Sequence, residues 1–125
     1  MLLIDDEAAL VQALRIVLQG SHEIAVETSA FGGLDRILSA EEPFDAILCD
    51  LAMPGKDGVD LYEEVRELRP GLERRIIFMT GGAFTPRAAR FLAGIPNTTI
   101  EKPFEIASIN EAVARVFDAV SVVET

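Results

Sequence analysis

Four largely apolar runs in this chain each end in a carboxylate, a hydroxyl or an amine. The runs and the residues that follow them are 1–4 with Asp5 and Asp6, 46–49 with Asp50, 75–79 with Thr80, and 98–101 with Lys102. Short apolar runs are typical of strands that are buried on both faces of a parallel sheet. Because the carboxyl ends of parallel strands lie at one edge, these side chains should converge where such sheets bind ligands. An acidic cluster, a hydroxyl and a cation at that edge indicate a metal-assisted site for a phosphoryl group.

Strand and helix patterns alternate along the whole chain. Strands are expected at 1–4, 23–28, 45–50, 75–79 and 98–101, and helices at 7–19, 30–40, around 61–68, from Pro86 to near Gly94, and from about 105 to 120. Thr85 is the expected N-cap of the fourth helix, with Pro86 at its first position. Strands and helices that alternate at this spacing form parallel sheets with right-handed crossovers. The predicted fold is therefore α/β: a doubly wound five-stranded parallel sheet with helices on both faces.

The same patterns indicate which apolar residues form the core. The expected helical stripes are Leu10, Val11, Leu14, Val17 and Leu18; Leu61, Val65 and Leu68; and Ile106, Ile109, Val113, Val116, Phe117 and Val120. These sets recur at the spacing of one helix face. We also expect Phe31, Phe44 and Phe78 in the core. Cys49 should be buried as well, on the side of the strand opposite to Asp50, because adjacent strand residues face opposite sides.

The length and composition are those of a single domain, expected to span residues 1–125. No apolar run approaches the roughly 18 residues of a membrane span, so this domain should make no membrane contact. No secretion signal is expected at the start of the chain. The single cysteine, Cys49, excludes an internal disulfide and fits a reducing compartment, so we expect a cytoplasmic protein.

The chain is strongly acidic, with a net charge of -10 from 21 acidic and 11 basic residues. This balance argues against binding to nucleic acid, which requires clusters of Lys and Arg to displace counterions. Most of the excess of acidic over basic residues is explained by the solubility that a net charge gives a protein. Only the clustered acids are assigned to function.

Asp5, Asp6 and Asp50 are the candidate metal ligands. If they gather at one edge, each carboxylate pair about 5 Å apart repels by roughly 3 kcal/mol at an effective dielectric of 20, so a cation or protons must neutralise them. Oxygen ligands favour Mg²⁺, Mn²⁺ or Ca²⁺, and one His and one Cys are too few for zinc. Each Asp alone is better explained as a cap. Together with Thr80 and Lys102, the three favour a metal site.

Lys102 and Thr80 complete the predicted site. A lysine at a strand end can hold a phosphate oxygen as a point charge. Pro103 follows it and ends the strand, with a cis peptide bond as one way of doing so. Thr80 precedes Gly81 and Gly82, whose backbone freedom would allow the hydroxyl to be re-aimed.

Four segments together resemble the response-regulator receiver domain of two-component signalling: residues 3–7, 49–58, 78–82 and 101–104. Each segment alone is weak, but all four occur in order, at the spacing of the family, and they cover the whole chain. Residues 80–104 also resemble receivers fused to the C-terminus of hybrid histidine kinases. The resemblance implies a flavodoxin-like sheet of the receiver type and a phosphoacceptor function.

The resemblance assigns a role to each acidic residue. Asp50 matches the phosphoacceptor, which takes a phosphoryl group from a phosphohistidine on a histidine kinase or a histidine phosphotransfer protein. Asp6 matches the direct ligand of Mg²⁺, with Mn²⁺ as an alternative ion, and Asp5 matches the acid that holds the ion through water. The backbone carbonyl of Ala52 matches a further ligand.

The resemblance also assigns the switch. Lys102 matches the lysine that pairs with the phosphoryl group, and Thr80 matches the hydroxyl that moves to bond it. The family often has an aromatic residue three positions before the lysine, where this chain has Thr99. We therefore expect the loop after Thr80 to carry the conformational change, with Phe84 placed to transmit it.

The resemblance implies a signalling domain rather than an enzyme, with weak self-phosphorylation from small donors and self-dephosphorylation. It allows a hybrid histidine kinase as the parent protein and a dimer through the face of the fourth and fifth helices. The alternative is a phosphate-independent pseudo-receiver that serves as an interaction module, which would be natural if Asp50, Lys102 or an acid of the first pair were missing. A hydrolase would need an acid where Ala52 stands, and a nucleotide-binding domain would need a glycine-rich loop after the first strand.

Overall fold

Five parallel strands form one sheet in the order β2-β1-β3-β4-β5. The computed structural model describes residues 1–20, 22–81, 85–103 and 105–124, with the backbone alone for 119–124. The strands are β1 (Leu2–Ile4), β2 (Ala25–Glu27), β3 (Ile47–Asp50), β4 (Ile76–Thr80) and β5 (Thr99–Glu101). The chain winds one way from β1 to β2 and the other way from β3 onward. The carboxyl ends of β1 and β3 therefore flank the crevice where ligands bind in such sheets.

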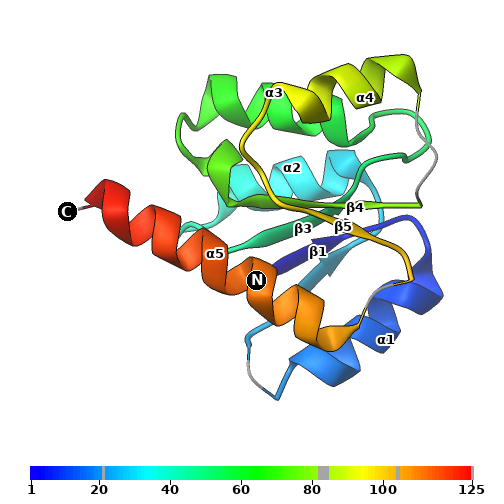
Figure 1. Cartoon of the computed structure of the whole chain (residues 1–125). Coiled ribbons are helices and arrows are strands. Elements are labelled where there is room, and N and C mark those ends of the chain that lie inside the picture. The colour runs from blue at the N-terminus through cyan, green and yellow to red at the C-terminus, as the bar shows by residue number, and fades with distance from the viewer. Residues whose placement is uncertain (21, 82–84, 104, 125) are drawn as a thin grey trace.

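Helices cover both faces of the sheet (Figure 1). The helices α1 (Ala8–Leu18) and α5 (Ile106–Glu124) lie on one face, and α2 (Ala30–Ser39), α3 (Gly58–Leu68) and α4 (Pro86–Ala93) lie on the other. A 3₁₀ helix, η1 (Leu72–Arg75), precedes β4. Among the described residues, no helix combines the length and the apolar character needed to cross a bilayer. The predicted fold class is confirmed.

Strand alternation divides the core into two layers. In β3, Ile47 and Cys49 join the cluster under α2, α3 and α4, whereas Leu48 joins the cluster under α1 and α5. Phe78 of β4 is fully buried in the first cluster and contacts Phe91 edge-on, with ring centroids 5.6 Å apart. The predictions for Cys49 and Phe78 are confirmed, and Phe44 is partly buried against the same cluster.

Four residues that we predicted in the core are exposed. The exposed fractions are 53% for Val17, 59% for Phe31, 47% for Leu68 and 42% for Phe117. The buried stripe of α1 is Val11, Leu14 and Leu18, which leaves Val17 on the solvent side. Leu68 is the last residue of α3. On α5 the buried stripe consists of Ile109, Ala112, Val113 and Val116, and Phe117 lies outside it.

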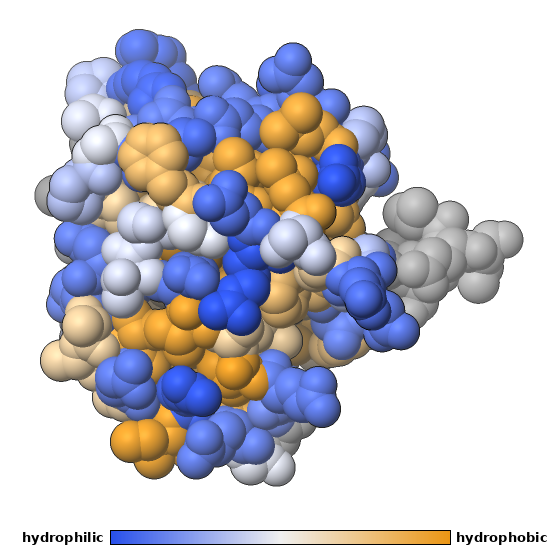
Figure 2. Space-filling model, turned by 180° about the vertical axis from the view of Figure 1, so that it is seen from behind, coloured by the Kyte–Doolittle hydropathy of each residue, from blue (hydrophilic) through white to orange (hydrophobic). Residues whose placement is uncertain are grey.

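Phe31 has a different reason for its exposure. It lies in the first turn of α2, and the Lys56 Nζ is 4.8 Å from the centroid of its ring. The same ammonium group pairs with Glu64, so the ring of Phe31 faces a lysine cation at the surface rather than the apolar core. Seen from behind, the molecule shows hydrophobic areas separated by a band of hydrophilic side chains (Figure 2).

The helix starts follow the capping signals of the sequence. The side chain of Thr85 accepts a hydrogen bond from the amide of Ala88, with Pro86 in the first turn, as predicted. The bounds of the elements differ from the predicted ones mainly at their ends, and α5 continues to Glu124. The Lys102-Pro103 peptide bond is cis. Phe84 and the side chain of Val120 lie outside the described residues, so the predictions about them are not tested.

We predict that Gly58→Ala destabilises the protein by about 1–3 kcal/mol, the usual range for an overpacked core. A Cβ at residue 58 would lie 2.9 Å from the carbonyl oxygen of Asp50 and 3.0 Å from the Cα of Leu51, and neither backbone atom can move aside cheaply. Gly20→Ala is the matched control, because a Cβ there meets nothing within 4 Å. Urea unfolding should place the control within about 0.5 kcal/mol of wild type. Equal effects of the two substitutions would contradict the close approach at Gly58.

Candidate functional site

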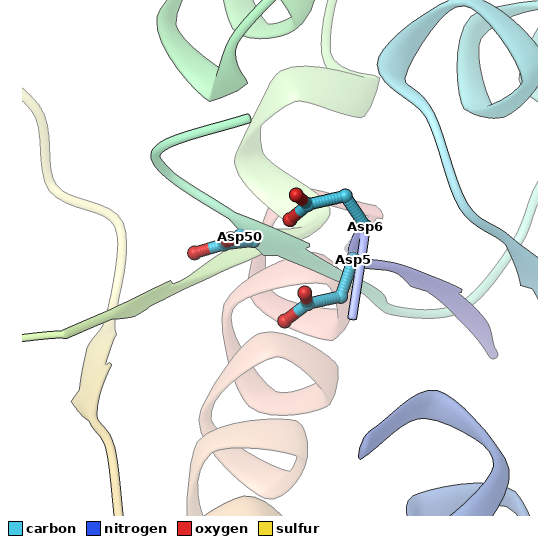
Figure 3. A group of neighbouring side chains, drawn as sticks. All are labelled: Asp5, Asp6 and Asp50. Carbon is cyan, nitrogen blue, oxygen red and sulfur yellow. The ribbon is translucent and has the colours of Figure 1, made fainter. Parts of the chain in front are cut away.

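Three carboxylates meet at the carboxyl ends of the two central strands (Figure 3). Asp5 and Asp6 follow β1 directly, and Asp50 is the last residue of β3, which pairs with β1. One carboxylate oxygen from each residue lies within 4.8 Å of the others. Asp5 and Asp50 are buried, with exposed fractions of 1% and 6%, whereas Asp6 is exposed. The structure thus brings the predicted cluster together and leaves one side of it open to solvent.

Lys102 reaches this cluster from the end of β5. Its Nζ lies 2.7 Å from Asp5 Oδ2, 3.2 Å from Glu7 Oε1 and 3.7 Å from Asp50 Oδ1. The backbone amide of Lys102 also donates to the carbonyl of Thr80, which fixes the end of β5 against β4. Our sequence reasoning missed Glu7. Its position directly after the acidic pair was the only signal that could have suggested it.

The protonation of Asp50 reflects this crowding. Burial, followed by the charge of Asp5, raises the pKa of Asp50, and the net result of all its surroundings is a pKa of about 6. Lys102 and the backbone amide of Ala52 act in the opposite direction but do not cancel the rise. In the metal-free protein, the negative charge of Asp50 at neutral pH therefore lowers the free energy of unfolding.

Lys102 remains a cation in this setting. Burial lowers the pKa of Lys102, but its hydrogen bond to Asp5 and the charges of Asp50 and Asp5 outweigh burial and hold the pKa above its usual value. One protonated lysine cannot neutralise Asp5, Asp6, Glu7 and Asp50 together. The cluster therefore carries excess negative charge, which favours the binding of a cation.

Thr80 lies beside the cluster, at the end of β4. It is 2% exposed, and its Oγ1 has no hydrogen-bond partner among the described residues. Buried hydroxyls are nearly always hydrogen-bonded, so an exception suggests a partner that arrives during function. The other buried polar atom without a partner among the described residues is Asn97 Oδ1. The Nδ2 of the same side chain donates to the carbonyls of Glu73 and Ile76, and these two hydrogen bonds fix the orientation of the side chain.

Ala52 lies two residues after Asp50 and is exposed. It is the second residue of the connection from β3 to α3, and that connection closes where the amide of Gly58 donates to the carbonyl of Leu51. The role of the Ala52 carbonyl as a metal ligand stays a prediction.

The donor set fits a hard divalent cation. Its members are carboxylate oxygens, two of them buried, gathered within 4.8 Å and short of positive charge. Mg²⁺ prefers oxygen ligands and is commonly held by one or two carboxylates together with phosphate oxygens. The residues present thus suit Mg²⁺ better than zinc, which favours nitrogen and sulfur.

Residues 1–114 match the response regulator receiver domain family. The response regulator protein FleR of Pseudomonas aeruginosa is 33% identical over 115 residues, which cover 91% of this chain and 24% of FleR. The chemotaxis protein CheY of Halobacterium salinarum is 29% identical over 119 residues, which cover 94% of this chain and 96% of that protein. This chain spans about a quarter of FleR and 45% of the transcriptional regulatory protein ResD of Bacillus subtilis.

Solved structures share the fold. The crystal structure of a CheY-like response regulator receiver domain protein from Methanospirillum hungatei superposes with a TM-score of 0.80 at 28% identity, covering 94% of this chain and 92% of that one. The crystal structure of FixJ-N gives a TM-score of 0.79 at 26% identity, covering 94% and 91% of the two chains.

We predict that Asp50→Asn stabilises the metal-free protein above pH 6. An Asp whose folded pKa of about 6 lies above the unfolded value near 3.9 opposes folding when it is ionised. In EDTA at pH 7.5, the free energy of unfolding should rise by up to about 3 kcal/mol, since the shift is about two pKa units, each unit corresponds to about 1.4 kcal/mol, and solvent screening reduces the full value. This gain should shrink as the pH falls below 6 and vanish near pH 3, below both pKa values, where wild-type Asp50 is protonated in the folded and the unfolded state.

Asp118→Asn, an exposed carboxylate on α5, is the control and should show no such trend. Urea unfolding across this pH range measures both variants. If the gain in the free energy of unfolding of Asp50→Asn instead grows as the pH falls, the prediction is wrong.

Proposed function

This chain belongs to the response regulator receiver domain family, and from that premise we propose that it accepts a phosphoryl group on Asp50 in a Mg²⁺-dependent reaction and changes conformation as a result. The observation that carries the proposal is the meeting of Asp50 with Asp5, Asp6 and Lys102 at one edge of the sheet. The pseudo-receiver alternative is not favoured, because each residue that it would lack is present.

The chemistry follows from the positions of the side chains. A carboxylate oxygen of Asp50 attacks phosphorus and forms a P–O bond while the P–N bond to the donor histidine breaks. The imidazole leaves and takes up a proton. The Lys102 amine, 3.7 Å from Asp50 Oδ1, attracts the oxygens of the incoming anion and holds them near the carboxylate.

Asp5, Asp6 and Asp50, with the carbonyl of Ala52, are the residues that would hold Mg²⁺. When bound, the ion supplies the positive charge that allows an anionic group to approach three carboxylates. Mn²⁺ satisfies the same oxygen ligands. Weak self-phosphorylation from small donors and self-dephosphorylation follow from the same site.

Thr80 turns phosphorylation into a signal. Its buried Oγ1 lacks a partner among the described residues, so a phosphoryl oxygen on Asp50 offers it a charged acceptor. Such a hydrogen bond stabilises by about 1.5–3 kcal/mol and exists only in the phosphorylated state, as a two-state shift requires. Thr99 is exposed on β5 and lacks an aromatic ring, so the change should pass through the segment that follows Thr80.

The partners follow from the reaction. The donor is a phosphohistidine on a histidine kinase or a histidine phosphotransfer protein, and a parent hybrid kinase fits residues 80–104. We propose that residues 1–125 form one receiver domain in the cytoplasm, which the buried free thiol of Cys49 supports. The charge of -10 supports protein partners over nucleic acid. A dimer through α4 and α5 is part of the same proposal.

Incubation with acetyl phosphate and Mg²⁺ should add one phosphoryl group to the protein, as measured by intact mass. Asp50→Asn and EDTA should each abolish the addition, because the first removes the nucleophile and the second the cation. Asp118→Asn should be modified like wild type. Modification that persists in Asp50→Asn would remove Asp50 from its assigned role.

Asp6→Ala should weaken Mg²⁺ binding more than Asp5→Ala does. Asp5 is already engaged, since its Oδ1 accepts from the amide of Glu7 at 2.9 Å and its Oδ2 pairs with Lys102. Asp6 is exposed and better able to bind the ion directly. We expect Kd to rise about tenfold for Asp5→Ala, as for residues that act through a ligand or water, and further for Asp6→Ala. Thermal melts titrated with Mg²⁺ measure both values, and equal losses would contradict the assignment.

A further inference from the structure

Arg87 links the helix that follows Thr80 to the helix that follows Asp50. It is the second residue of α4, and its guanidinium forks between two carboxylates of α3 and its cap. The Arg87 Nη1 lies 3.0 Å from Asp57 Oδ2, and the Nη2 lies 3.1 Å from Asp60 Oδ1. These residues lie 30 and 27 positions from Arg87 in sequence, so the contacts are tertiary.

The two carboxylates are fixed before Arg87 meets them. Asp57 Oδ1 accepts from the amide of Asp60 at 2.9 Å, and Asp60 Oδ2 accepts from the amide of Asp57 at 3.2 Å, which forms a capping box at the start of α3. The remaining oxygen of each carboxylate faces the guanidinium. A rigid fork that meets two preset acceptors loses less side-chain entropy than an ordinary surface ion pair.

The rest of α4 is held by apolar contacts. Ala88 is its only buried residue, and partly buried Phe91 packs edge-on against Tyr62 and Phe78, at centroid distances of 5.0 and 5.6 Å. Apolar contacts of this kind are not directional, whereas the fork of Arg87 fixes one position of the first turn of α4 relative to α3.

We propose that Arg87 is a positioning residue that holds α4 in its resting place and so opposes the rearrangement that accompanies phosphorylation. The inference rests on the proposed function. Thr80 precedes Arg87 by seven residues, so a shift of Thr80 toward Asp50 bears on the first turn of α4. Contacts present in only one of two states bias the equilibrium toward that state. We assign the Arg87 contacts to the resting state because Thr80 Oγ1, in the same structure, has no hydrogen-bond acceptor among the described residues.

Beryllofluoride, a non-covalent mimic of the phosphoryl group, tests the proposal in saturating Mg²⁺. Coupling between a ligand and a conformational equilibrium is reciprocal, so a variant released from the resting state must bind the mimic more tightly. Amide NMR titrations should give Arg87→Ala a Kd about three- to tenfold below that of wild type, the scale of a networked surface ion pair. Arg87→Lys, which reaches one carboxylate at a time, should give an intermediate value.

Arg90→Ala is the matched control, since Arg90 is one turn further along α4, exposed, and in no ion pair with a described residue. The ratio of the wild-type and Arg87→Ala constants should fall toward one at about 0.5 M salt, where exposed ion pairs are screened. A purely structural role would not follow ionic strength in this way. Asp57 and Asp60 are not varied, because their loss would also remove the cap of α3.

The outcomes separate the two proposals. If wild type binds the mimic, Asp50→Asn does not, and Arg87→Ala matches Arg90→Ala, then the role of Arg87 is wrong and the phosphoacceptor function stands. Weaker binding by Arg87→Ala would likewise overturn the role, since it would assign the ion pairs to the activated state. If neither wild type nor any variant binds the mimic, both proposals fall.

Discussion

Repulsion among three carboxylates held within 4.8 Å is the constraint on which the site depends. Two of these carboxylates are buried, and burial makes their mutual charge harder to screen. Lys102 offsets part of it, and in doing so it ties the end of β5 to Asp5, 97 residues earlier in the chain. The ion pair spans the sheet from β5 to β1, across β4 and β3. Lys102 thus helps to hold the fold together. Its single positive charge does not neutralise the carboxylates, so the site still lacks positive charge where an anion would bind.

The alternation of the strands makes this arrangement compatible with a dry core. In β3, Cys49 points into the layer under α2, α3 and α4, while Asp50 ends the strand at the open edge. A slip of one residue in the pairing of β3 would exchange the two faces and bring a carboxylate under the helices. Such a slip would also break the fit of the side chains of β1, β3 and β4 that pack in the two core layers. The register is therefore set by the core, and the positions of the site residues follow from it.

The fold could be predicted from the sequence because buried parallel strands and amphipathic helices have different periods, and because Thr85 and Pro86 mark the start of α4. The acidic cluster was predictable for the same reason: residues at strand ends must meet. Periodicity gives the angle of a side chain around a helix, but it does not show where packing against the sheet ends, which is why Leu68 was wrongly placed. It also does not show how wide the buried stripe is, which is why Phe117, next to buried Val116, was wrongly placed. Glu7 and Arg87 were missed because their partners come from other elements.

Two groups have opposite effects on the equilibrium between the resting and the phosphorylated state: the Thr80 hydroxyl, which lacks a described partner, and the Arg87 guanidinium, which has two. Thr80 Oγ1 is buried without a described partner, and such a hydroxyl costs about 1–3 kcal/mol, which favours any state that gives it an acceptor. Arg87 has its contacts already and favours the state that keeps them. Surface ion pairs are weak in general, so the second contribution can hold α4 in place without locking it. A small gap between two states is what a modest chemical event can reverse, because a ligand shifts an equilibrium only by its differential affinity for the two states. The helix α4 follows Thr80 in the chain and contacts the cap of α3 through Arg87, so both contributions act on the same helix.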